Sequence, residues 1–505
     1  RRPPRSTLFP YTTLFRSGKN VTREVYLDPP RGGLRGLQQG QLLRALKAIY
    51  GFAEAARLFW LALKEQLEAD GWQESKLEPA LFYLRHQGQL KGILVTHVDD
   101  LEGGVSPDLQ QSAFERASQA LEFATNHFGS FIFRGREIRQ TTEGHIDVSM
   151  RNYSLSLKNV KIEKERRKQL EDELRPGEME QLNSSAGELG WLARQLRCDL
   201  AYENGVAQRS KKEPIVADLL RLRQYISAAR RGADFKMRYW NDVDLKDGVI
   251  IHLADSGHAN GTPEHNEQMR YRSVGGYFIL VADKAILQGE TVRCNILCYH
   301  SGQTKRVCRS TLAAEASHLA EAVEAGDWIT VLLEEALTGE LDLRNWADLV
   351  ERRQRVYVTD ARSVYDYLQK DATSTSTDKR MAIEGALLRE TCRKTGAHVK
   401  WIDGLQNIAN VLTKHNAEKD TLRAFLKDGM MSLQQTEQNK LLKEKQRQAR
   451  QKRAQVKRDD TALKEQKKLE RRKAVLAEVK DESSDIQAHS KEKYNECEEM
   501  PAFSH

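Results

Sequence analysis

The chain has 505 residues, of which 39% are hydrophobic, with six cysteines and a formal net charge of +8. This length and composition allow roughly three domains with cores of their own and exclude a small disulfide-stapled scaffold. No run of about 18 apolar residues and no secretory signal pattern occurs, so a cytoplasmic or nuclear protein is predicted, neither secreted nor bound to a membrane. Nothing in the composition indicates an oligomeric state.

The cysteines are scattered along the chain. The only close pair, Cys294 and Cys298, lacks a second pair of ligands at zinc-site spacing. Reduced thiols are therefore expected, and a zinc site is not.

The first 240 residues divide into three parts. Residues 1–18 contain the near-repeat STLF and TTLF, match no periodicity, and are predicted to be non-native, adapter-like sequence. In residues 19–105, the segment LLRALKAIYGFAEAARLFWLALKEQLEADGW has helical spacing, and ALFYL and GILVTHV predict strands. In residues 106–240, FGSFIFRGREIRQ and HIDVSM predict strands, and LNSSAGELGWLARQLRCDLAYENGVAQRS predicts a helix pair.

Residues 245–420 show the clearest pattern. Three strand-like runs, GVIIHLADSG, VGGYFILVAD and NILCYHS, precede the helical segment TLAAEASHLAEAVEAGDWITVLLEEAL. A fourth strand, QRVYVTD, is followed by the helices ARSVYDYLQK and KRMAIEGALLRETCRKTG, the strand HVKWID and the helix NIANVLTK. This order predicts a mixed sheet flanked by helices.

Residues 428–505 are polar and charged. One apolar residue recurs every seven positions, at Leu442, Ala449, Val456 and Leu463. A single seam position is too narrow for a coiled coil, so a solvated, partly formed helix is predicted, followed by a disordered end from residue 481. Residues 439–480 hold 16 Lys or Arg and 6 Asp or Glu, so the rest of the chain is slightly negative.

Three acids in residues 245–420 stand where metal-dependent chemistry would place them. Asp255 ends the first strand, Asp360 ends the fourth, and Glu315 lies one turn inside the long helix, so they can converge at one sheet edge. Two Mg²⁺ ions about 4 Å apart need several oxygen ligands of this kind for phosphoryl displacement. The alternative is that both Asp residues cap turns, and spacing alone favours that alternative.

Five motifs in this region then add a family resemblance. LADSGHAN, RYRSVGGYFIL, STLAAEASHLA, YVTDARSVYDYL and NIANVLTKH occur in this order and resemble the ribonuclease H domain of copia-type (Ty1/copia) LTR retrotransposon Pol polyproteins. The resemblance implies an enzyme that hydrolyses RNA in RNA–DNA hybrids by two-metal catalysis with Mg²⁺ (or Mn²⁺). It makes Asp255, Glu315 and Asp360 the catalytic metal ligands.

The same resemblance implies further site residues. The substrate-binding candidates are Arg272, Ser273, Tyr277 and Ser363. Asn410 occupies the place of the family's fourth acid, and as a catalytic residue it is a weakened ligand because its carbonyl oxygen is neutral. Asp403 on the preceding strand is a less favoured replacement. The alternative function is therefore a catalytically decayed remnant that at most binds nucleic acid.

The upstream segments KAIYGFAEAARLFW, SKLEPALFYL and THVDDLEGG resemble copia reverse transcriptase. The resemblance implies a truncated palm over residues 19–105, a thumb or connection region over 106–240, and metal ligands Asp99 and Asp100 at a hairpin tip. An ordinary Asp turn is the alternative. The family's earlier Asp motif lies upstream of EVYLDPPRGG, so polymerase activity is not expected of this chain. The expected class is an α/β and α+β multidomain protein.

The cations of residues 439–480 predict salt-sensitive binding to an RNA–DNA hybrid. Aromatic residues that would stack on bases are absent from this segment, so a solvated helical face is an equally supported alternative.

Overall fold

The computed structural model of the chain describes residues 23–28, 38, 41–47, 52–97, 100–110, 112–121, 127–263, 265–369, 378–415, 417 and 419–434. The predictions for the adapter-like segment and for the basic tail lie outside this set. Among these residues, no helix combines the length and the apolar composition needed to cross a membrane. The five cysteines that the structure describes are free thiols.

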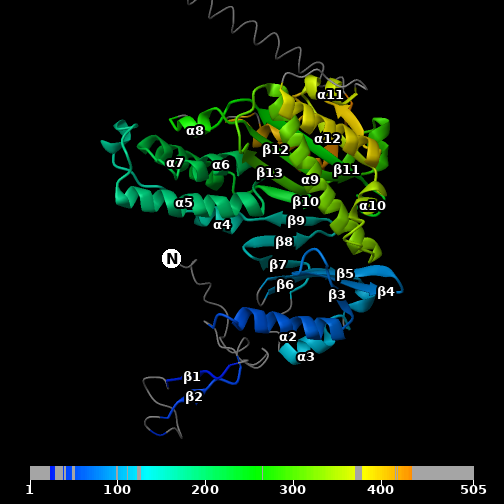
Figure 1. The fold of residues 1–505 in the computed structure, drawn as a ribbon. Helices are drawn as coiled ribbons and strands as arrows, with labels where there is room; N and C mark the ends of the chain where they lie inside the picture. The colour runs from blue at the N-terminus through cyan, green and yellow to red at the C-terminus, as the bar shows by residue number, and fades with distance from the viewer. Residues whose placement is uncertain are drawn as a thin grey trace, which may run out of the picture. The chain divides into compact units, whose positions relative to one another are not determined.

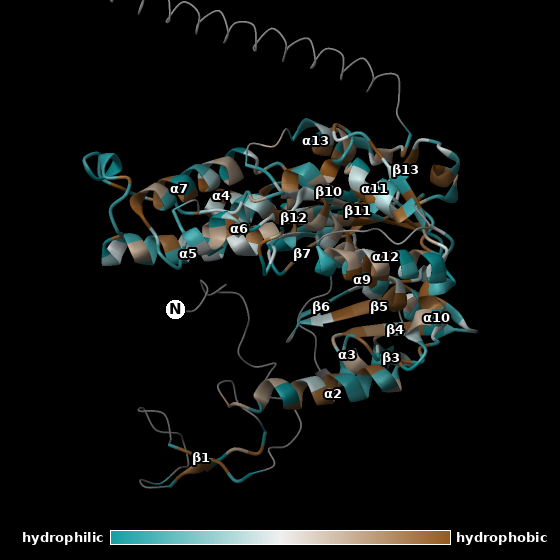
Figure 2. Ribbon diagram, turned by 45° about the horizontal axis from the view of Figure 1, so that its top comes forward, coloured by the Kyte–Doolittle hydropathy of each residue, from teal (hydrophilic) through white to brown (hydrophobic). Residues whose placement is uncertain are grey.

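The first elements form a two-stranded and a four-stranded antiparallel sheet, the latter in the order β3-β4-β5-β6. The elements are β1 (Tyr26–Leu27), β2 (Leu43–Arg44), α2 (Ala55–Ala69), β3 (Trp72–Glu74), β4 (Leu81–His86), β5 (Gln89–His97), β6 (Asp100–Val105), η1 (Pro107–Leu109) and α3 (Glu115–Leu121). The strands predicted at β4 and β5 are confirmed, and Figure 2 shows both as predominantly hydrophobic. The predicted helix begins later than expected, because Leu43–Arg44 pairs with β1 as a strand.

A further antiparallel sheet of four strands has the order β10-β9-β8-β7. Its strands are β7 (Ser130–Phe133), β8 (Arg136–Gln140), β9 (Ile146–Ser149) and β10 (Lys236–Tyr239). The helical segments of this region are α4 (Arg151–Ser156), η2 (Arg166–Lys168), α5 (Pro176–Gln195), η3 (Cys198–Leu200), α6 (Ala201–Arg209) and α7 (Val216–Arg231). The predicted strands and the predicted helix pair are both confirmed. Proline suits the first turn of α5, where its missing N–H has no helical partner.

A six-stranded mixed sheet has the order β15-β14-β11-β12-β13-β16 (Figure 1). Its strands are β11 (Val249–Gly257), β12 (Val274–Ala282), β13 (Val292–Gln303), β14 (Arg355–Thr359), β15 (His398–Trp401) and β16 (Met430–Met431). Strands β11, β12 and β13 are antiparallel, whereas β14 runs parallel to β11 and β15 runs parallel to β14. The predicted mixed sheet is therefore confirmed.

The helical segments around this sheet are α8 (Glu267–Arg270), η4 (Lys284–Gln288), α9 (Thr311–Thr338), α10 (Trp346–Glu351), α11 (Arg362–Gln369), α12 (Lys379–Thr395), η5 (Ile408–Leu412) and α13 (Asp420–Asp428). The glycine stop predicted for α12 is confirmed, because Gly396 caps the helix in the left-handed region at φ +62°. The predicted final helix is the short 3₁₀ segment η5.

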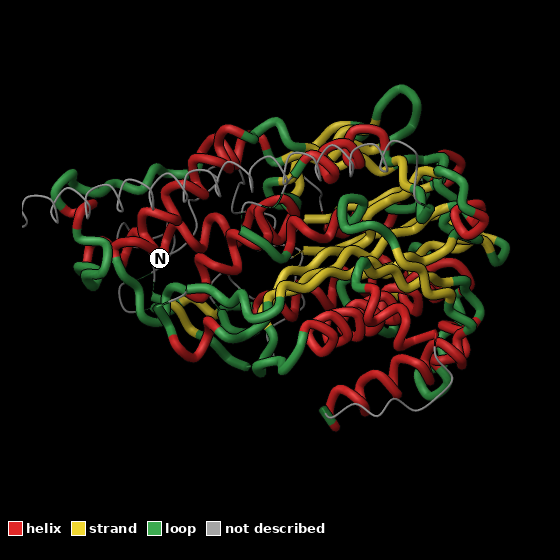
Figure 3. Tube along the Cα trace, turned by 90° about the horizontal axis from the view of Figure 1, so that it is seen from above, coloured by secondary structure: helices red, strands yellow, loops and turns green. Residues whose placement is uncertain are grey.

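Helices cover both faces of the six-stranded sheet (Figure 3). All nine residues of β11 are buried. Because side chains alternate along a strand, Ile251 and Leu253 join the core formed with α5, α6 and α7, while Ile250 and Ala254 join the core formed with α9. A continuous apolar run of this kind is typical of a strand covered on both faces.

One hydrophobic cluster extends from Phe133 to Leu433 and includes residues of α5, α6 and α7 as well as of the six-stranded sheet. The sequence boundary between residues 106–240 and 245–420 is therefore not a boundary between cores. The sheet also extends further than predicted, because β16 pairs with Val292 and Arg293 of β13 although the sequence assigned it to the tail. A two-residue strand has no periodicity that a sequence pattern could reveal.

The C-terminal end of α9 contacts the sheet β3-β4-β5-β6. Glu335 accepts hydrogen bonds from the Ser75 hydroxyl at 2.5 Å and from the Lys76 backbone N–H at 2.8 Å. Arg85 donates to the carbonyl of Ala336 at 2.8 Å. The helix therefore touches one sheet along its length and a second sheet at its end.

Candidate metal centre

Asp255 is the seventh residue of β11, and it is 1% exposed. It lies opposite Gly276 of β12 in the strand register. Its Oδ2 accepts a short hydrogen bond from the Thr413 hydroxyl and lies 3.3 Å from Lys414 Nζ. One oxygen of this carboxylate is therefore fixed by the segment that follows η5.

Glu315 lies in the second turn of α9 and is 6% exposed. The helix begins where the Ser310 hydroxyl accepts a hydrogen bond from the Ala313 N–H at 3.1 Å, an ordinary N-cap. Glu315 Oε2 is buried and has no hydrogen-bond partner among the described residues. Burial raises the pKa of Glu315 to about 9, and the neighbouring Asp255 and Asp360 carboxylates contribute to this rise.

Asp360 follows the last residue of β14, and its backbone carbonyl accepts a hydrogen bond from Trp401 Nε1 at 2.9 Å. Because β14 runs parallel to β11, the ends of both strands lie at the same sheet edge. Burial and then the charge of Asp255 raise the pKa of Asp360 to about 6, while Lys414 and a hydrogen bond with Asn407 act in the opposite direction.

The three carboxylates converge. One oxygen from each of Asp255, Glu315 and Asp360 lies within 4.8 Å of the others, and no other group of three such ligands occurs among the described residues. Burial raises the pKa values of Glu315 and Asp360, and Glu315 Oε2 has no partner among the described residues, so the three acids ionise together more readily when a cation is bound. Carboxylate oxygens are the ligands that Mg²⁺ and Mn²⁺ prefer, so the residues fit a divalent ion.

Asn410 lies in η5 and is linked to Asp255 through Lys414, whose ammonium contacts both side chains. Its amide donates to the carbonyls of Gly404 at 2.6 Å and Asn407 at 3.0 Å, and its Oδ1 accepts from Lys414 Nζ at 2.7 Å. Its role as a weakened ligand stays a prediction. Asp403 accepts a hydrogen bond from the Leu405 N–H at 3.1 Å and lies outside the group of three.

The four predicted substrate-binding residues differ in burial and in their contacts. Ser273 is fully buried, and its Oγ accepts from the Ala259 N–H at 3.3 Å, which is a structural contact. Tyr277 is half-buried on β12 against His300, with ring centroids 5.5 Å apart. Ser363 is exposed in the first turn of α11, three residues after Asp360.

Arg272, the fourth predicted substrate-binding residue, is half-buried just before β12. Its backbone N–H donates to the carbonyl of Met269 at 3.0 Å. Its contact with substrate stays a prediction.

Sequence reasoning did not assign several residues that shape this site. Thr413 and Lys414 contact Asp255, and Asn407 bonds to Asp360. A Cβ on Gly276 would lie 2.5 Å from the Cβ of Leu412, so only glycine lets η5 pack this closely on β12. The sequence holds a signal for these residues, since all of them except the glycine lie in the motif NIANVLTK, from which only Asn410 is predicted as a site residue.

The predicted polymerase pair is described only in part. Asp99 lies outside the described residues. Asp100 begins β6 and pairs with His97 across the β5–β6 hairpin. The polymerase assignment of this hairpin therefore stays a prediction from resemblance.

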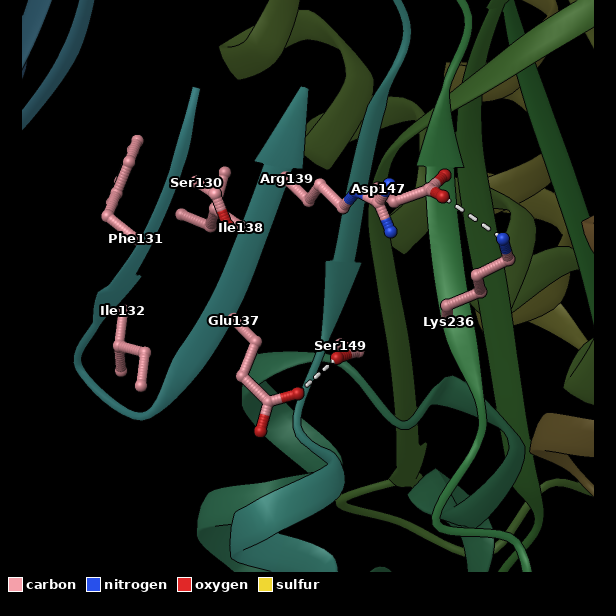
Figure 4. Close-up of a pocket in the computed structure, with 9 residues that line it drawn as sticks. All are labelled: Ser130, Phe131, Ile132, Glu137, Ile138, Arg139, Asp147, Ser149 and Lys236. Atoms are coloured by element: carbon pink, nitrogen blue, oxygen red, sulfur yellow. Dashed lines mark hydrogen bonds and ion pairs between the residues drawn. The ribbon is translucent and has the colours of Figure 1, made fainter. Parts of the chain in front are cut away.

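A cavity of about 500 Å³ on the sheet β10-β9-β8-β7 offers a different set of acids (Figure 4). It is lined by Ser130, Phe131, Ile132, Glu137, Ile138, Arg139, Asp147, Ser149 and Lys236. Glu137 accepts from the Ser149 hydroxyl at 2.5 Å, and Asp147 pairs with Lys236 at 3.0 Å. A hydrogen bond from Arg238 is the main cause that lowers the pKa of Asp147. These acids are partnered, and they form no metal-ligand group of three in the described part of the chain.

No protein-family model matches the chain. Two curated proteins of Arabidopsis thaliana align with 137 residues of it: the retrovirus-related Pol polyproteins from transposons RE1, at 27% identity, and RE2, at 28%. The aligned segment makes up 27% of this chain and 9% of each polyprotein. The chain therefore has a distant, partial likeness to Ty1/copia-type Pol polyproteins.

Three solved ribonuclease H structures also align with a third of the chain. They are the N-terminal domain of a Mycobacterium tuberculosis protein (13% identity, TM-score 0.22), an enzyme isolated from compost (14%, 0.22) and one from Halobacterium salinarum (11%, 0.21). The alignments cover 33–35% of this chain and 92–98% of those chains. By its own strand order, the chain is a mixed α/β protein with a six-stranded mixed sheet, and three acids converge at one edge of that sheet.

Proposed function

We propose that the six-stranded sheet and its helices form a divalent-metal-dependent nuclease that hydrolyses RNA in RNA–DNA hybrids. The observation that carries this proposal is the convergence of Asp255, Glu315 and Asp360 from three separate elements, with ligand oxygens within 4.8 Å of one another. The partial likeness to retrotransposon Pol polyproteins and the order of the five sequence motifs support the substrate class.

The proposed reaction breaks one phosphorus–oxygen bond of the RNA strand, adds the hydroxyl of water to phosphorus, and returns a proton to the leaving oxygen. A bound Mg²⁺ or Mn²⁺ would polarise the phosphoryl group and make water a better nucleophile. Asp255, Glu315 and Asp360 would hold it. Thr413 fixes the orientation of Asp255, since its hydroxyl donates to Oδ2, and Asn407 does the same for Asp360.

The basic segment 439–480 is proposed as a second contact to the hybrid. Its excess of Lys and Arg would neutralise phosphates irrespective of sequence, so its contribution to affinity should fall as salt rises. Affinity that is unchanged at high salt would contradict this role.

A second candidate is nucleic-acid binding without cleavage. Asn410 supplies no charge where the family has an acid, and its carbonyl oxygen is engaged by Lys414. A site with fewer anionic ligands holds divalent ions more weakly. The fold would then still bind a hybrid, because binding to phosphates does not need the metal.

The test is cleavage of a labelled RNA–DNA hybrid by the full chain in Mg²⁺ and in Mn²⁺. Asp360→Asn should lower the rate by about 100-fold or more, which exceeds the loss typical of residues that only support a ligand. Asp366→Asn is the matched control, because this α11 carboxylate is 44% exposed and its ion-pair partner among the described residues is Arg362. Its rate should stay within about twofold of the parent's.

Other outcomes separate the two candidates. Equal cleavage by the parent and by Asp360→Asn would contradict the nuclease proposal. Hybrid binding without cleavage would favour the second candidate, and activity gained by Asn410→Asp would then identify the missing charge as the cause.

A further inference from the structure

Lys414 places a fixed positive charge inside the carboxylate group. Its Nζ lies 3.3 Å from Asp255 Oδ2 and 2.7 Å from Asn410 Oδ1. The Lys414 side chain is 48% exposed, whereas the Asp255 side chain is 2% exposed. The ammonium therefore bridges a buried acid and the amide that stands where a fourth acid was expected.

The contacts of Asp255 limit how many ions it can serve. Its Oδ2 accepts from the Thr413 hydroxyl and faces the Lys414 ammonium. A carboxylate bridges two metal ions either with one oxygen on each ion or through a single oxygen whose lone pairs are both free. With Oδ2 engaged by two donors, Oδ1 is the atom left for a cation.

The charges point the same way. Three ionised carboxylates carry three negative charges, and Asn410 adds none. Without substrate, one divalent ion together with the Lys414 ammonium balances them, whereas two divalent ions beside the same ammonium would leave an excess of two positive charges around the buried Asp255 and Glu315.

We propose that this centre binds a single divalent ion, held by Asp255, Glu315 and Asp360, and that the Lys414–Asn410 pair takes the place of a second ion. The inference rests on the metal centre of the proposed function but not on cleavage itself. Under it, Lys414 is a positioning residue that sets how many ions the centre accepts.

The test counts ions rather than turnover. Free Mn²⁺ is measured by electron paramagnetic resonance during titration of the full chain, with Asp360→Asn as the background. One Mn²⁺ per chain should be lost in the Asp360→Asn variant. Two ions lost together, or none, would overturn the inference.

Three variants test the role of the Lys414–Asn410 pair. Lys414→Met combined with Asn410→Asp should raise the count at the centre from one ion to two, and a count that stays at one would contradict the proposal. Lys414→Arg keeps the charge and should bind one. Lys394→Met is the control, because Lys394 is 66% exposed on α12 and its replacement removes one surface charge. This variant should also bind one ion.

The outcomes remain distinguishable from failure of the proposed function. A parent that binds one Mn²⁺ yet leaves the hybrid intact would refute the nuclease and leave this inference standing. A parent that cleaves the hybrid and binds two would refute the inference and leave the nuclease standing.

Discussion

Two groups of acids in this molecule are built in opposite ways. In the cavity on the sheet β10-β9-β8-β7, Asp147 pairs with Lys236 (Figure 4). It also pairs with Arg238, and its pKa is lowered. In the candidate metal centre, Glu315 has a buried oxygen without a partner among the described residues, and its pKa is raised to about 9. A fold that compensates acids on one sheet and leaves them undercompensated on another indicates where an external cation belongs.

The difference follows from where the acids sit. Asp147 lies on a strand whose neighbour presents Lys236 and Arg238 on the same side, so the cations come with the strand register. The acids of the centre come from two strand ends and a helix, so no single strand register supplies cations to all of them. Among the described residues, the one cation in an ion pair with the group is Lys414, from the segment that follows η5.

The largest expected contrast concerns stability in the presence of metal. Mn²⁺ at about 100 times its dissociation constant should stabilise the parent by about 2.7 kcal/mol, because it binds the folded state only. Asp255→Asn should abolish this gain, as measured by chemical denaturation of the full chain. Asp147→Asn should lower the stability without metal, since it breaks two ion pairs, but should keep the gain. If Asp147→Asn also lost the stabilisation by Mn²⁺, the assignment of the metal to Asp255 and not to Asp147 would be wrong.

The pH dependence of stability should have opposite signs in the two groups. The pKa of Glu315 rises from its usual 4.5 to about 9, so the folded state binds the proton more tightly, and metal-free stability should fall as pH rises between these values. Glu315→Gln should remove the share of this slope that Glu315 causes, and at pH 8 it should be more stable than the metal-free parent by up to roughly 5 kcal/mol.

The opposite sign applies to Asp147. Its pKa lies below the usual 3.8, so its contribution is present above that pH and is lost as pH falls further. Asp147→Asn should therefore cost stability at neutral pH and little at strongly acidic pH. Denaturation curves at a series of pH values, with EDTA present, measure both slopes; equal signs would contradict the assignment.

The smallest expected effect is at the rim of the metal centre. Ser363 is exposed beside Asp360 in sequence, and one hydrogen bond to substrate is worth about 1 kcal/mol. Ser363→Ala should raise KM for the hybrid about fivefold at unchanged kcat. Ser130→Ala, an exposed serine at the edge of the cavity, should change neither. A similar KM change in both variants would remove the distinction.

The sequence predicts most of the mixed sheet because its strands are long, apolar runs between clear turn residues. The 28-residue helix α9 is predicted from apolar residues at helical spacing. It also located the three acids that converge, because strand ends and helix starts are visible in the pattern. The beginning of α2 was placed too early, because apolar residues at helical spacing in Leu43–Arg44 are also compatible with the strand observed there.

Other features depend on contacts that no local pattern encodes. The shared core that unites α5, α6 and α7 with the sheet forms between segments that the sequence assigned to different domains. The motif makes Ser273 a substrate-binding candidate. Its burial, at 0% exposure, and its hydrogen bond from the Ala259 N–H are visible only in the fold. The approach of Lys414 to Asp255 requires glycine at 276, and that requirement appears only when η5 is seen against β12.

The complete burial of β11 has a consequence for how the centre is lost. Its backbone is bonded to β12 along all nine residues and to β14 over residues 250–253, so the amide hydrogens of this doubly paired stretch exchange with solvent only when the sheet opens. Asp255 lies two residues beyond that stretch and is held by β12. Asp255 is thus attached to a segment at the high end of the local-stability range, while Ser363 stands on an exposed turn. Local fluctuations can therefore displace Ser363 many times before they displace Asp255, whose position is lost only when the sheet unfolds.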